Sequence, residues 1–368
     1  MNIGVNTRLL LPNKLEGIGR FTLEILKRVV PNHPEHQFYF FFDRSFDSQF
    51  VFADNITPVV IRPQARHPIL YKIWFDYSIS KALKKHNIDV FLSPDGFLSK
   101  RTKIPQIAVI HDLNFEHYPE DLPKKDANYY KNNFPIYAKL AGHIITVSEF
   151  SKGDIVRQYG VNPDKISVAY NAAGELFAPI KDKTLFENRY GALDGYFIYV
   201  GALHSRKNIV RMLQAFDLYK TNSQSSKKLV IVGQKLFKSP EIESAYNQLK
   251  SISDIIFTGR LPDQDLANTI ASSSGMIYVS YFEGFGIPII EAFKCGVPVL
   301  TSNVTSLPEV GGNLAIYADP FDVKSIAHGI QQLEQSEVTK EELIARANLF
   351  NWDNSAEVVW NVIENQFK

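Results

Sequence analysis

Short apolar runs alternate with longer amphipathic stretches along most of the chain. The runs are rich in Val, Ile, Phe and Tyr and are bounded by polar residues, glycine or proline, which is typical of buried β-strands. Between many of them, apolar residues recur three and four positions apart, as on the inward face of a helix. The predicted strands cover residues 3–5, 38–42, 58–61, 90–92, 107–110, 144–147, 166–168, 196–200, 229–232, 255–257, 275–279, 299–300 and 314–317.

The helical periods complete a strand–helix alternation. Short apolar strands that alternate with helices predict an α/β fold, in which parallel sheets are covered by helices on both faces. The predicted helices cover residues 20–29, 73–85, 127–140, 151–159 and 287–294, followed by an extended helical tail from residue 323.

A polar stretch at residues 175–188 lacks any apolar period and is the natural break in this pattern. The chain of 368 residues is long enough for two domains of ordinary size. We therefore predict two Rossmann-like, doubly wound domains, 1–177 and 178–351, with a C-terminal helix of about 352–368 that packs back on the first. If the carboxyl edges of the two predicted sheets face each other, they would form a cleft for the substrate.

Composition excludes several classes of protein. The chain is 45% hydrophobic and 21% charged, as in folded globular proteins, and its net charge of +1 gives no reason to expect a nucleic-acid partner. The single cysteine, Cys295, excludes an internal disulfide and suits a reducing compartment. No apolar window reaches the roughly 20 residues that a membrane helix needs, and the N-terminus lacks a signal-peptide pattern. We predict a cytoplasmic protein.

The most informative stretch is a glycine-rich turn between two glutamates, Glu283 and Glu291. It follows a predicted strand and precedes a helix that has Pro288 in its first turn, where proline is tolerated. Open α/β sheets bind ligands at such turns, where free N–H groups and the helix dipole favour anions. Two acids beside an anion site suggest contacts with a polyhydroxylated ligand such as a sugar or ribose. Ordinary solvated acids at a helix start are the alternative.

Three further turns carry candidate residues. Gly17-Ile18-Gly19-Arg20 precedes a helix expected near Phe21 and could expose N–H groups, although a flexible helix entry is equally compatible. His111-Asp112 follows a buried strand, where a histidine could bond a sugar hydroxyl or could be structural. Arg206 and Lys207 precede a helix, and because cations there oppose the helix dipole, we expect an anion such as a diphosphate to neutralise them.

These motifs together resemble the signature of retaining GT-B glycosyltransferases of glycosyltransferase family 4 (GT4). The resemblance rests first on Glu283 and Glu291 around Gly-Phe-Gly, and it covers almost the whole chain, more loosely in the first ~100 residues, where loops vary with specificity. The other motifs in the order expected of the family are Gly17-Ile18-Gly19-Arg20, His111-Asp112, the segment 146–151, Arg206-Lys207-Asn208, Phe257-Thr258-Gly259, Pro298-Val299 and Leu307-Pro308-Glu309.

The resemblance implies a nucleotide-diphosphate-sugar donor held mainly by the second domain. It implies that Glu291 binds the ribose hydroxyls, that Glu283 binds the sugar hydroxyls and that Arg206 and Lys207 neutralise the diphosphate. It also implies that His111 reaches the donor sugar. The remaining implied binding residues are Gly284, Phe285, Gly286 and Ile287 around the sugar, Gly17 and Gly19 near the β-phosphate, Gly201 beside the cations, and Thr258 and Gly259 beside the base.

One position departs from the family pattern. Many relatives carry an arginine directly after the glycine that corresponds to Gly201, whereas this chain has Ala202. We expect Arg206 to supply the second cation instead. The histidines lack the spacing of metal ligands, and the motif Asp263-Gln264-Asp265 is explained as a helix start. We therefore expect no metal and no cofactor besides the donor.

The acceptor is less well specified. We expect hexose transfer, with GDP-mannose favoured over UDP-hexoses, to a glycan or lipid-linked saccharide in cell-surface polysaccharide synthesis. The aromatic and basic stretch 69–85 could lie on an anionic membrane surface, but packing into the first domain's core is the favoured interpretation. The alternatives are a UDP-sugar 2-epimerase, a glycan phosphorylase, or a non-catalytic sugar-nucleotide-binding protein.

Overall fold

The computed structural model describes residues 1–12, 15, 17–182, 189–191, 194–233 and 240–367. The chain forms two compact units, of which unit 1 comprises Met1–Asn171 with Asn351–Lys368 and unit 2 comprises Ala172–Phe350. Residues 183–188 of the predicted break lie outside the described residues. Each unit has its own sheet and its own core.

Unit 1 is built on a seven-stranded sheet in the order β3-β2-β1-β4-β5-β6-β7, in which every neighbouring pair is parallel. The central strand β1 pairs with β2 on one side and β4 on the other, and Ile3 faces Phe38 and Val90 in the two registers. The strands are β1 Asn2–Asn6, β2 Gln37–Phe42, β3 Ile56–Val60, β4 Val90–Ser93, β5 Gln106–Val109, β6 His143–Thr146 and β7 Ile166–Val168.

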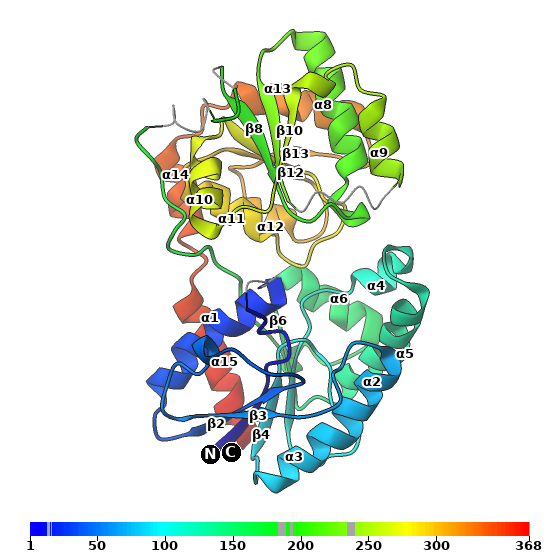
Figure 1. The fold of residues 1–368 in the computed structure, drawn as a ribbon, viewed down its shortest axis with the longest axis vertical. Helices are drawn as coiled ribbons and strands as arrows, with labels where there is room; N and C mark the ends of the chain where they lie inside the picture. Colours follow the sequence, from blue (N-terminus) through cyan, green and yellow to red (C-terminus); the bar gives the residue numbers. More distant parts are fainter. Residues whose placement is uncertain (13–14, 16, 183–188, 192–193, 234–239, 368) are drawn as a thin grey trace. The chain divides into compact units, whose positions relative to one another are not determined.

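Helices cover both faces of this sheet (Figure 1). One layer contains α1 and the C-terminal helix α15, which pack against each other, and the other contains α2 to α6. The helices are α1 Gly17–Asn32, α2 Pro68–Ile73, a π-helical turn Trp74–Ile79, α3 Ser80–Lys85, α4 Asn114–His117, α5 Lys124–Leu140, α6 Glu149–Tyr159 and α15 Trp352–Phe367, with short 3₁₀ turns at Ser48–Phe50, Pro119–Asp121 and Pro163–Lys165.

Unit 2 has a six-stranded parallel sheet in the order β10-β9-β8-β11-β12-β13. The order reverses between β8 and β11, which are neighbours in space although two strands separate them in sequence. The strands are β8 Tyr196–Val200, β9 Lys228–Val232, β10 Ile255–Gly259, β11 Gly275–Tyr278, β12 Val299–Ser302 and β13 Ile316–Ala318.

The helices of unit 2 also form two layers (Figure 1). In one layer α8 packs against α9 and α13, and in the other α11 packs against α10, α12 and α14. The helices are α8 Ile209–Ser223, α9 Pro240–Asn247, α10 Asp263–Ser272, α11 Ile287–Lys294, α12 Leu307–Gly311, α13 Val323–Glu334 and α14 Lys340–Ala347, with 3₁₀ turns at Ser205–Lys207 and Ile252–Asp254.

The structure confirms the predicted α/β fold with two parallel sheets, and it corrects two helix boundaries. Helix α1 begins at Gly17 rather than near Phe21, so the Gly17–Gly19 segment is the first turn of a helix and not a loop before it. The predicted tail from residue 323 is three separate helices, because a capping box between Thr339 and Glu342 starts α14 afresh.

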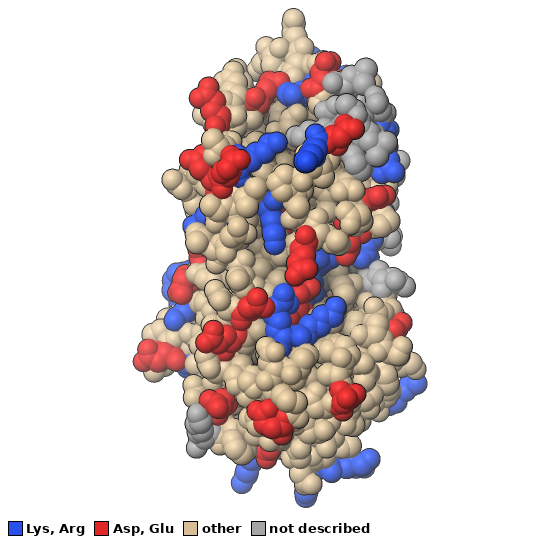
Figure 2. Space-filling model, turned by 90° about the vertical axis from the view of Figure 1, so that its left-hand side faces the viewer, with Lys and Arg blue, Asp and Glu red and all other residues tan. Residues whose placement is uncertain are grey.

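The surface shown in Figure 2 carries positive and negative side chains interspersed, in keeping with the net charge of +1. The face in view shows no extended area of one sign. Among the residues that the structure describes, no helix combines the length and the apolar character needed to cross a bilayer.

Candidate functional site

The candidate site of unit 2 lies where the strand order reverses, between β8 and β11. The loops that leave the carboxyl ends of these two strands carry Arg206 and Lys207 on one side and Glu283 on the other. Because the crossover connections leave on opposite faces of the sheet at this point, the loops diverge and leave a crevice in which open α/β sheets bind ligands. The topology therefore brings together motifs that lie far apart in the sequence.

Glu283 is buried and accepts hydrogen bonds from both cations of the first loop. Its Oε2 lies 2.7 Å from Nη1 of Arg206, and its Oε1 lies 2.5 Å from Nζ of Lys207. Arg206 also donates to the carbonyl of Phe282 at 3.2 Å. The alternative of ordinary solvated acids is thus wrong for this residue, and the anion beside the two cations in this structure is a carboxylate of the same chain.

Tyr278, the last residue of β11, is the third partner of Glu283. Its hydroxyl accepts from Nζ of Lys207 at 2.6 Å and donates to Oε1 of Glu283 at 2.9 Å. The ammonium of Lys207 also lies 4.9 Å from the centre of the Tyr278 ring, within the range of a cation–π contact. No sequence motif singles out Tyr278, and only its place at the end of a strand beside the glycine-rich turn could have suggested it.

The electrostatics of the cluster keep Glu283 ionised. Burial by itself would raise the pKa of this carboxyl, but the charges of Arg206 and Lys207 and the hydrogen bond from Lys207 lower the pKa to about 2. Burial, followed by the charge of Glu283, holds the pKa of Tyr278 well above its ordinary value, so its hydroxyl stays protonated. The cluster is therefore two cations, one anion and a neutral phenol at neutral pH.

Local backbone contacts hold the two loops in place. Asn208 adopts a left-handed conformation with φ of 60°, and its side-chain amide donates to the carbonyls of Val279 and Pro320. In the opposite direction, the backbone N–H of Tyr281 donates to the carbonyl of Arg206 at 3.0 Å. These cross-loop bonds fix the spacing between the cations and Glu283.

The glycine-rich turn leads directly into α11, whose first residue is Ile287. Gly286 has φ of 105°, a conformation that residues with a Cβ rarely adopt, and no side chain caps the helix start. The hydroxyl of Ser306 holds the turn by donating to the carbonyls of Glu283 and Phe285. Helix α11 thus begins four residues after Glu283.

The other predicted residues of unit 2 lie on the same sheet edge. Glu291 is buried within α11, so it too is not an ordinary solvated acid. Thr258 and Gly259 end β10, two strands away from β8, and Gly201 follows β8 directly. Gly201 and Gly259 both have positive φ, of 150° and 75°.

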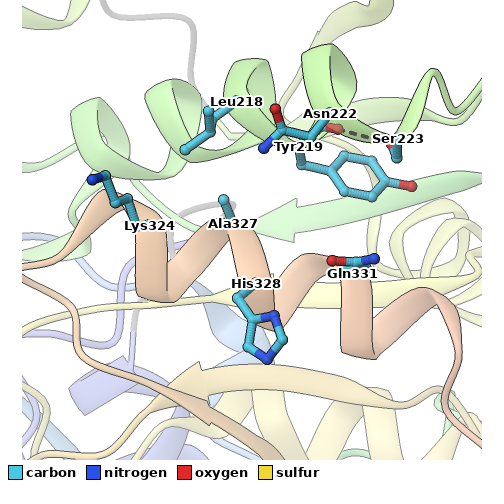
Figure 3. Close-up of a pocket in the computed structure, with 8 residues that line it drawn as sticks. All are labelled: Leu218, Tyr219, Asn222, Ser223, Lys324, Ala327, His328 and Gln331. Atoms are coloured by element: carbon cyan, nitrogen blue, oxygen red, sulfur yellow. Dashed lines mark hydrogen bonds between the residues drawn. The ribbon is translucent and has the colours of Figure 1, made fainter.

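Two hollows lie on the surface of unit 2. One, of about 450 Å³, adjoins the cation loop and is lined by residues that include His204, Ser205, Arg211 and Tyr281. The other, of about 330 Å³, lies between α8 and α13 and contains none of the predicted site residues (Figure 3). Its lining, which includes Tyr219, Lys324 and His328, gathers no set of groups typical of catalysis.

Unit 1 has its own reversal of strand order, between β1 and β4, and a buried ion pair occupies it. Nε of Arg8 lies 2.5 Å from Oδ2 of Asp95, and Asn6 donates to the other carboxylate oxygen at 2.8 Å. The guanidinium also lies 4.9 Å from the ring centre of Phe97 and 5.2 Å from that of Tyr71. Asp95 follows β4, the other strand of the reversal, and no sequence motif singles it out.

The remaining predicted residues belong to unit 1. His111 follows β5, and its Nε2 lies 2.9 Å from the carbonyl of Pro94, which can only accept, so Nε2 carries the proton and Nδ1 is left as an acceptor. Burial lowers the pKa of His111, which favours the neutral ring. Gly19 lies in the first turn of α1, where a Cβ would come within 2.7 Å of the carbonyl oxygen of Leu9.

Within the described parts of the chain, no three His, Cys, Asp or Glu side chains gather into a cluster that could hold a metal ion. The arrangement in unit 2 instead offers two side-chain cations, a helix start and two buried carboxylates. These groups can bind a diphosphate and hydroxyl groups by electrostatics and hydrogen bonds alone.

Two doubly wound parallel sheets in one chain, with a charged site at the reversal of the second, define a GT-B type of α/β protein. Comparison with known families agrees with this class: residues 15–173 match Glycosyltransferase Family 4, and residues 182–350 match Glycosyl transferases group 1. The O-antigen chain mannosyltransferase B of Escherichia coli is 30% identical over 357 residues, which cover 92% of this chain and 93% of that protein. The chain belongs to the group 1 glycosyltransferases of family 4 and is a transferase.

Other similarities are weaker in sequence. The O-antigen chain mannosyltransferase RfbU of Salmonella typhimurium is 29% identical over 261 residues, which cover 70% of this chain and 68% of that protein. A sucrose-phosphate synthase from Thermosynechococcus elongatus matches with a TM-score of 0.79 at 16% identity, over 100% of this chain and 99% of that one. HepE of Anabaena, solved with UDP-glucose, matches with a TM-score of 0.74 at 15% identity, over 99% and 100% of the two chains. At such identities the two structures show the shared GT-B fold.

Proposed function

We propose that this protein is a retaining hexosyltransferase that moves mannose from GDP-mannose to a saccharide or lipid-linked glycan during the synthesis of a cell-surface polysaccharide. The observation that carries the proposal is the buried cluster of Glu283 with Arg206 and Lys207 beside the start of α11. The names of the two mannosyltransferase relatives support mannose as the sugar. A UDP-hexose is the second candidate donor.

Each part of the site has a proposed role. Arg206, Lys207 and the N–H groups at the start of α11 bind the diphosphate, because all of them attract negative charge. Glu291 accepts from the ribose hydroxyls, and Glu283 accepts from the hydroxyls of the sugar. The groups proposed to complete the donor site are Gly17, Gly19, His111, Gly201, Thr258, Gly259, Gly284, Phe285, Gly286 and Ile287.

The chemistry follows from where charge develops. Cleavage of the bond between the anomeric carbon and the phosphate oxygen leaves positive charge on the sugar and negative charge on the leaving diphosphate. Cations and N–H groups fixed at the diphosphate stabilise that charge, and one such contact is typically worth about 3–4 kcal/mol. The departing phosphate can take the proton of the acceptor hydroxyl, so substitution on the same face retains the configuration without a protein nucleophile. We propose that no metal takes part.

The alternatives are a UDP-sugar 2-epimerase, a glycan phosphorylase or a non-catalytic sugar-nucleotide-binding protein. The names of the relatives favour transfer over the first two. A non-catalytic protein is disfavoured because the charged cluster of Arg206, Lys207 and Glu283 is complete.

The side chains of Trp74 and Phe75 are fully buried in the core of unit 1, which confirms the favoured interpretation of the stretch 69–85. We also propose that the protein works in the cytoplasm and that the exposed face of this stretch touches the inner face of the membrane. Residues 68–85 form a helical stretch whose exposed face includes Ile69, Ile73 and Tyr77, with exposed fractions of 65%, 39% and 47%. Lys81 follows on the same face, and the guanidinium of Arg101 lies 4.1 Å from the Tyr77 ring centre. Apolar and basic side chains on one face suit an anionic membrane surface. Flotation with vesicles that contain phosphatidylglycerol, compared with neutral vesicles, tests this contact.

The donor is identified by incubation of the protein with GDP-mannose, UDP-glucose, UDP-galactose and UDP-N-acetylglucosamine. A rise in thermal stability or slow hydrolysis with one of them names the donor, and GDP-mannose is the expected one. The transferase proposal fails if none of the four binds and Lys207→Ala changes nothing.

A further inference from the structure

The groups assigned to two different parts of the donor are bonded to each other in this structure. Arg206 and Lys207 are proposed to hold the diphosphate and Glu283 to hold the sugar, yet the two cations donate to the two oxygens of that one carboxylate. Glu283 engages Nη1 of Arg206 and one N–H of Lys207, although each cation carries further N–H groups. A diphosphate that takes these two donors has to displace Glu283 from them.

The geometry of the carboxylate resembles that of a bound phosphate. Its Oε2 faces Arg206 at 2.7 Å, and its Oε1 faces Lys207 at 2.5 Å. A phosphate would bind the two cations in the same way, with one of its oxygens facing each cation. Glu283 thus occupies the anion position of the cation pair from within the protein.

We propose that Glu283 determines specificity for the complete donor over the free nucleoside diphosphate, an inference that rests on the proposed function. When a nucleotide sugar binds, its diphosphate takes the two cations and its sugar hydroxyls donate to the released carboxylate. When the nucleoside diphosphate alone binds, the diphosphate still takes the cations, but no hydroxyl reaches Glu283. The carboxylate then stays buried without the two cations and keeps the hydrogen bond from the Tyr278 hydroxyl.

The size of the discrimination follows from what a buried carboxylate loses. A buried charge deprived of its partners is strongly destabilising, and a site built to bond a hydroxyl rejects ligands that lack it by large factors. Because Tyr278 still donates to Glu283, we expect only part of that penalty, a factor on the order of 10 to 100 in relative affinity. After transfer, the same penalty favours release of the nucleoside diphosphate.

Tyr278 acts as a positioning residue in this exchange. Its hydroxyl accepts from Lys207 and donates to Glu283, so it contacts both groups that change partners. The ring is fully buried in β11 and cannot follow either group away from the sheet. It can therefore keep Glu283 within reach of the sugar while Lys207 turns to the phosphate.

The test measures two dissociation constants for each variant by calorimetry, one for GDP and one for GDP-mannose, or for UDP and UDP-glucose if wild type binds that pair. In Glu283→Gln we expect the nucleoside diphosphate to bind about 10-fold more tightly and the nucleotide sugar more weakly. Glu291→Gln is the matched control, because the ribose that it is proposed to bind is present in both ligands. That variant should weaken both ligands by the same factor.

Two results overturn the inference. If the ratio of the two dissociation constants is the same in Glu283→Gln as in wild type, Glu283 does not discriminate between the two ligands. Only this inference then fails. If wild type binds neither member of any pair, the proposed function fails together with it. Should Glu283→Gln not fold, Tyr278→Phe replaces it. That variant removes the donor that Glu283 keeps in the nucleoside-diphosphate complex, so the nucleoside diphosphate should bind more weakly relative to the nucleotide sugar, and an unchanged ratio has the same negative meaning.

Discussion

The ammonium of Lys207 lies 2.5 Å from the carboxylate of Glu283, although 76 residues separate the two in sequence. Their contact exists because β8 and β11 are neighbours at the reversal of the sheet, so that the loops after these two strands meet. The pair couples the proposed phosphate and sugar ends of the donor site. A change at either residue should therefore affect both stability and turnover.

Removal of the Lys207 ammonium should strongly lower the rate of sugar transfer but leave the protein folded. Lys207→Ala takes away a cation fixed at the proposed leaving group, and the loss of one such contact typically costs a factor of about 10² to 10³ in kcat. Glu283 keeps its bonds to Arg206 and Tyr278, so the fold should survive. Lys324→Ala, at an exposed position of α13, is the control and should leave turnover unchanged. Equal rates in the two variants would contradict the role of Lys207.

Two glycines of the proposed donor site should respond oppositely to a methyl group. Gly286 has φ of 105°, and a Cβ there would come within 2.8 Å of Cδ2 of Leu307, so Gly286→Ala should cost about 1–3 kcal/mol in the free energy of unfolding. Gly17 has no heavy atom within 4 Å of an added Cβ, so Gly17→Ala should be neutral or stabilising by up to about 1 kcal/mol. Urea unfolding measures both, and a larger loss for Gly17→Ala would refute the comparison.

The stability of the protein should depend on Glu283 in acid. The pKa of Glu283 is about 2 in the folded chain, below the ordinary value of about 4.3 that we expect in the unfolded chain. Between these values the unfolded state binds more protons, so the contribution of Glu283, about 3 kcal/mol, is fully present above about pH 5 and is lost as the pH falls toward 2. In Glu283→Gln the fall in unfolding free energy between pH 5 and pH 3 should be smaller by about 1–2 kcal/mol. Identical pH profiles for the two proteins would rule out this coupling.

The ion pair of unit 1 should be far more sensitive to mutation than a surface pair. Asp95→Asn leaves Arg8 buried without its carboxylate, and breaking a buried pair typically costs about 3–5 kcal/mol. The matched control is Asp353→Asn, which removes the partner of Arg28 at a side chain that is 76% exposed, where a pair is worth about 1 kcal/mol or less. Thermal unfolding compares them, and similar shifts in Tm would argue against a structural role for Asp95.

Helix α15 should be required for unit 1 to fold. It contributes the buried side chains of Trp352, Val359, Val362 and Ile363, each worth about 1.5–3 kcal/mol when buried, against a typical domain stability of about 5–15 kcal/mol. A chain that ends at residue 350 should therefore lose protease resistance in residues 1–171 and keep it in unit 2. A chain that ends at residue 364, which retains all four side chains, is the control and should resist like wild type.

The sequence predicted the strands and α11 because their signals are local. A strand buried on both faces is a short apolar run, and Pro288 marks the first turn of α11. Helix α1 begins earlier than its sequence pattern predicts, because Gly17 and Gly19 are typical of a loop although Gly19 here allows the close approach of Leu9. Such a contact between segments leaves no trace in a local pattern.

In the candidate site, too, local motifs could be predicted from the sequence and contacts between distant segments could not. Motifs at strand ends located Arg206, Lys207, Glu283 and Glu291 in the sequence, and their proposed roles remain to be tested. That Glu283 itself neutralises the cations could not be predicted, since it depends on the order of strands in the sheet. Asp95 was missed for the same reason, because its partner lies on the neighbouring strand β1.

The chain leaves unit 1 after Asn171 and returns to it at Asn351, so unit 2 is one uninterrupted segment inserted into a unit that holds both termini. The first strand β1 and the last helix α15 both belong to unit 1. Residues 172–350 can thus be exchanged between relatives as a single cassette, which would transplant the proposed donor site without cutting the first sheet. Joining the two ends by a linker and opening the chain at 171/172 would give a circular permutant in which each unit is continuous.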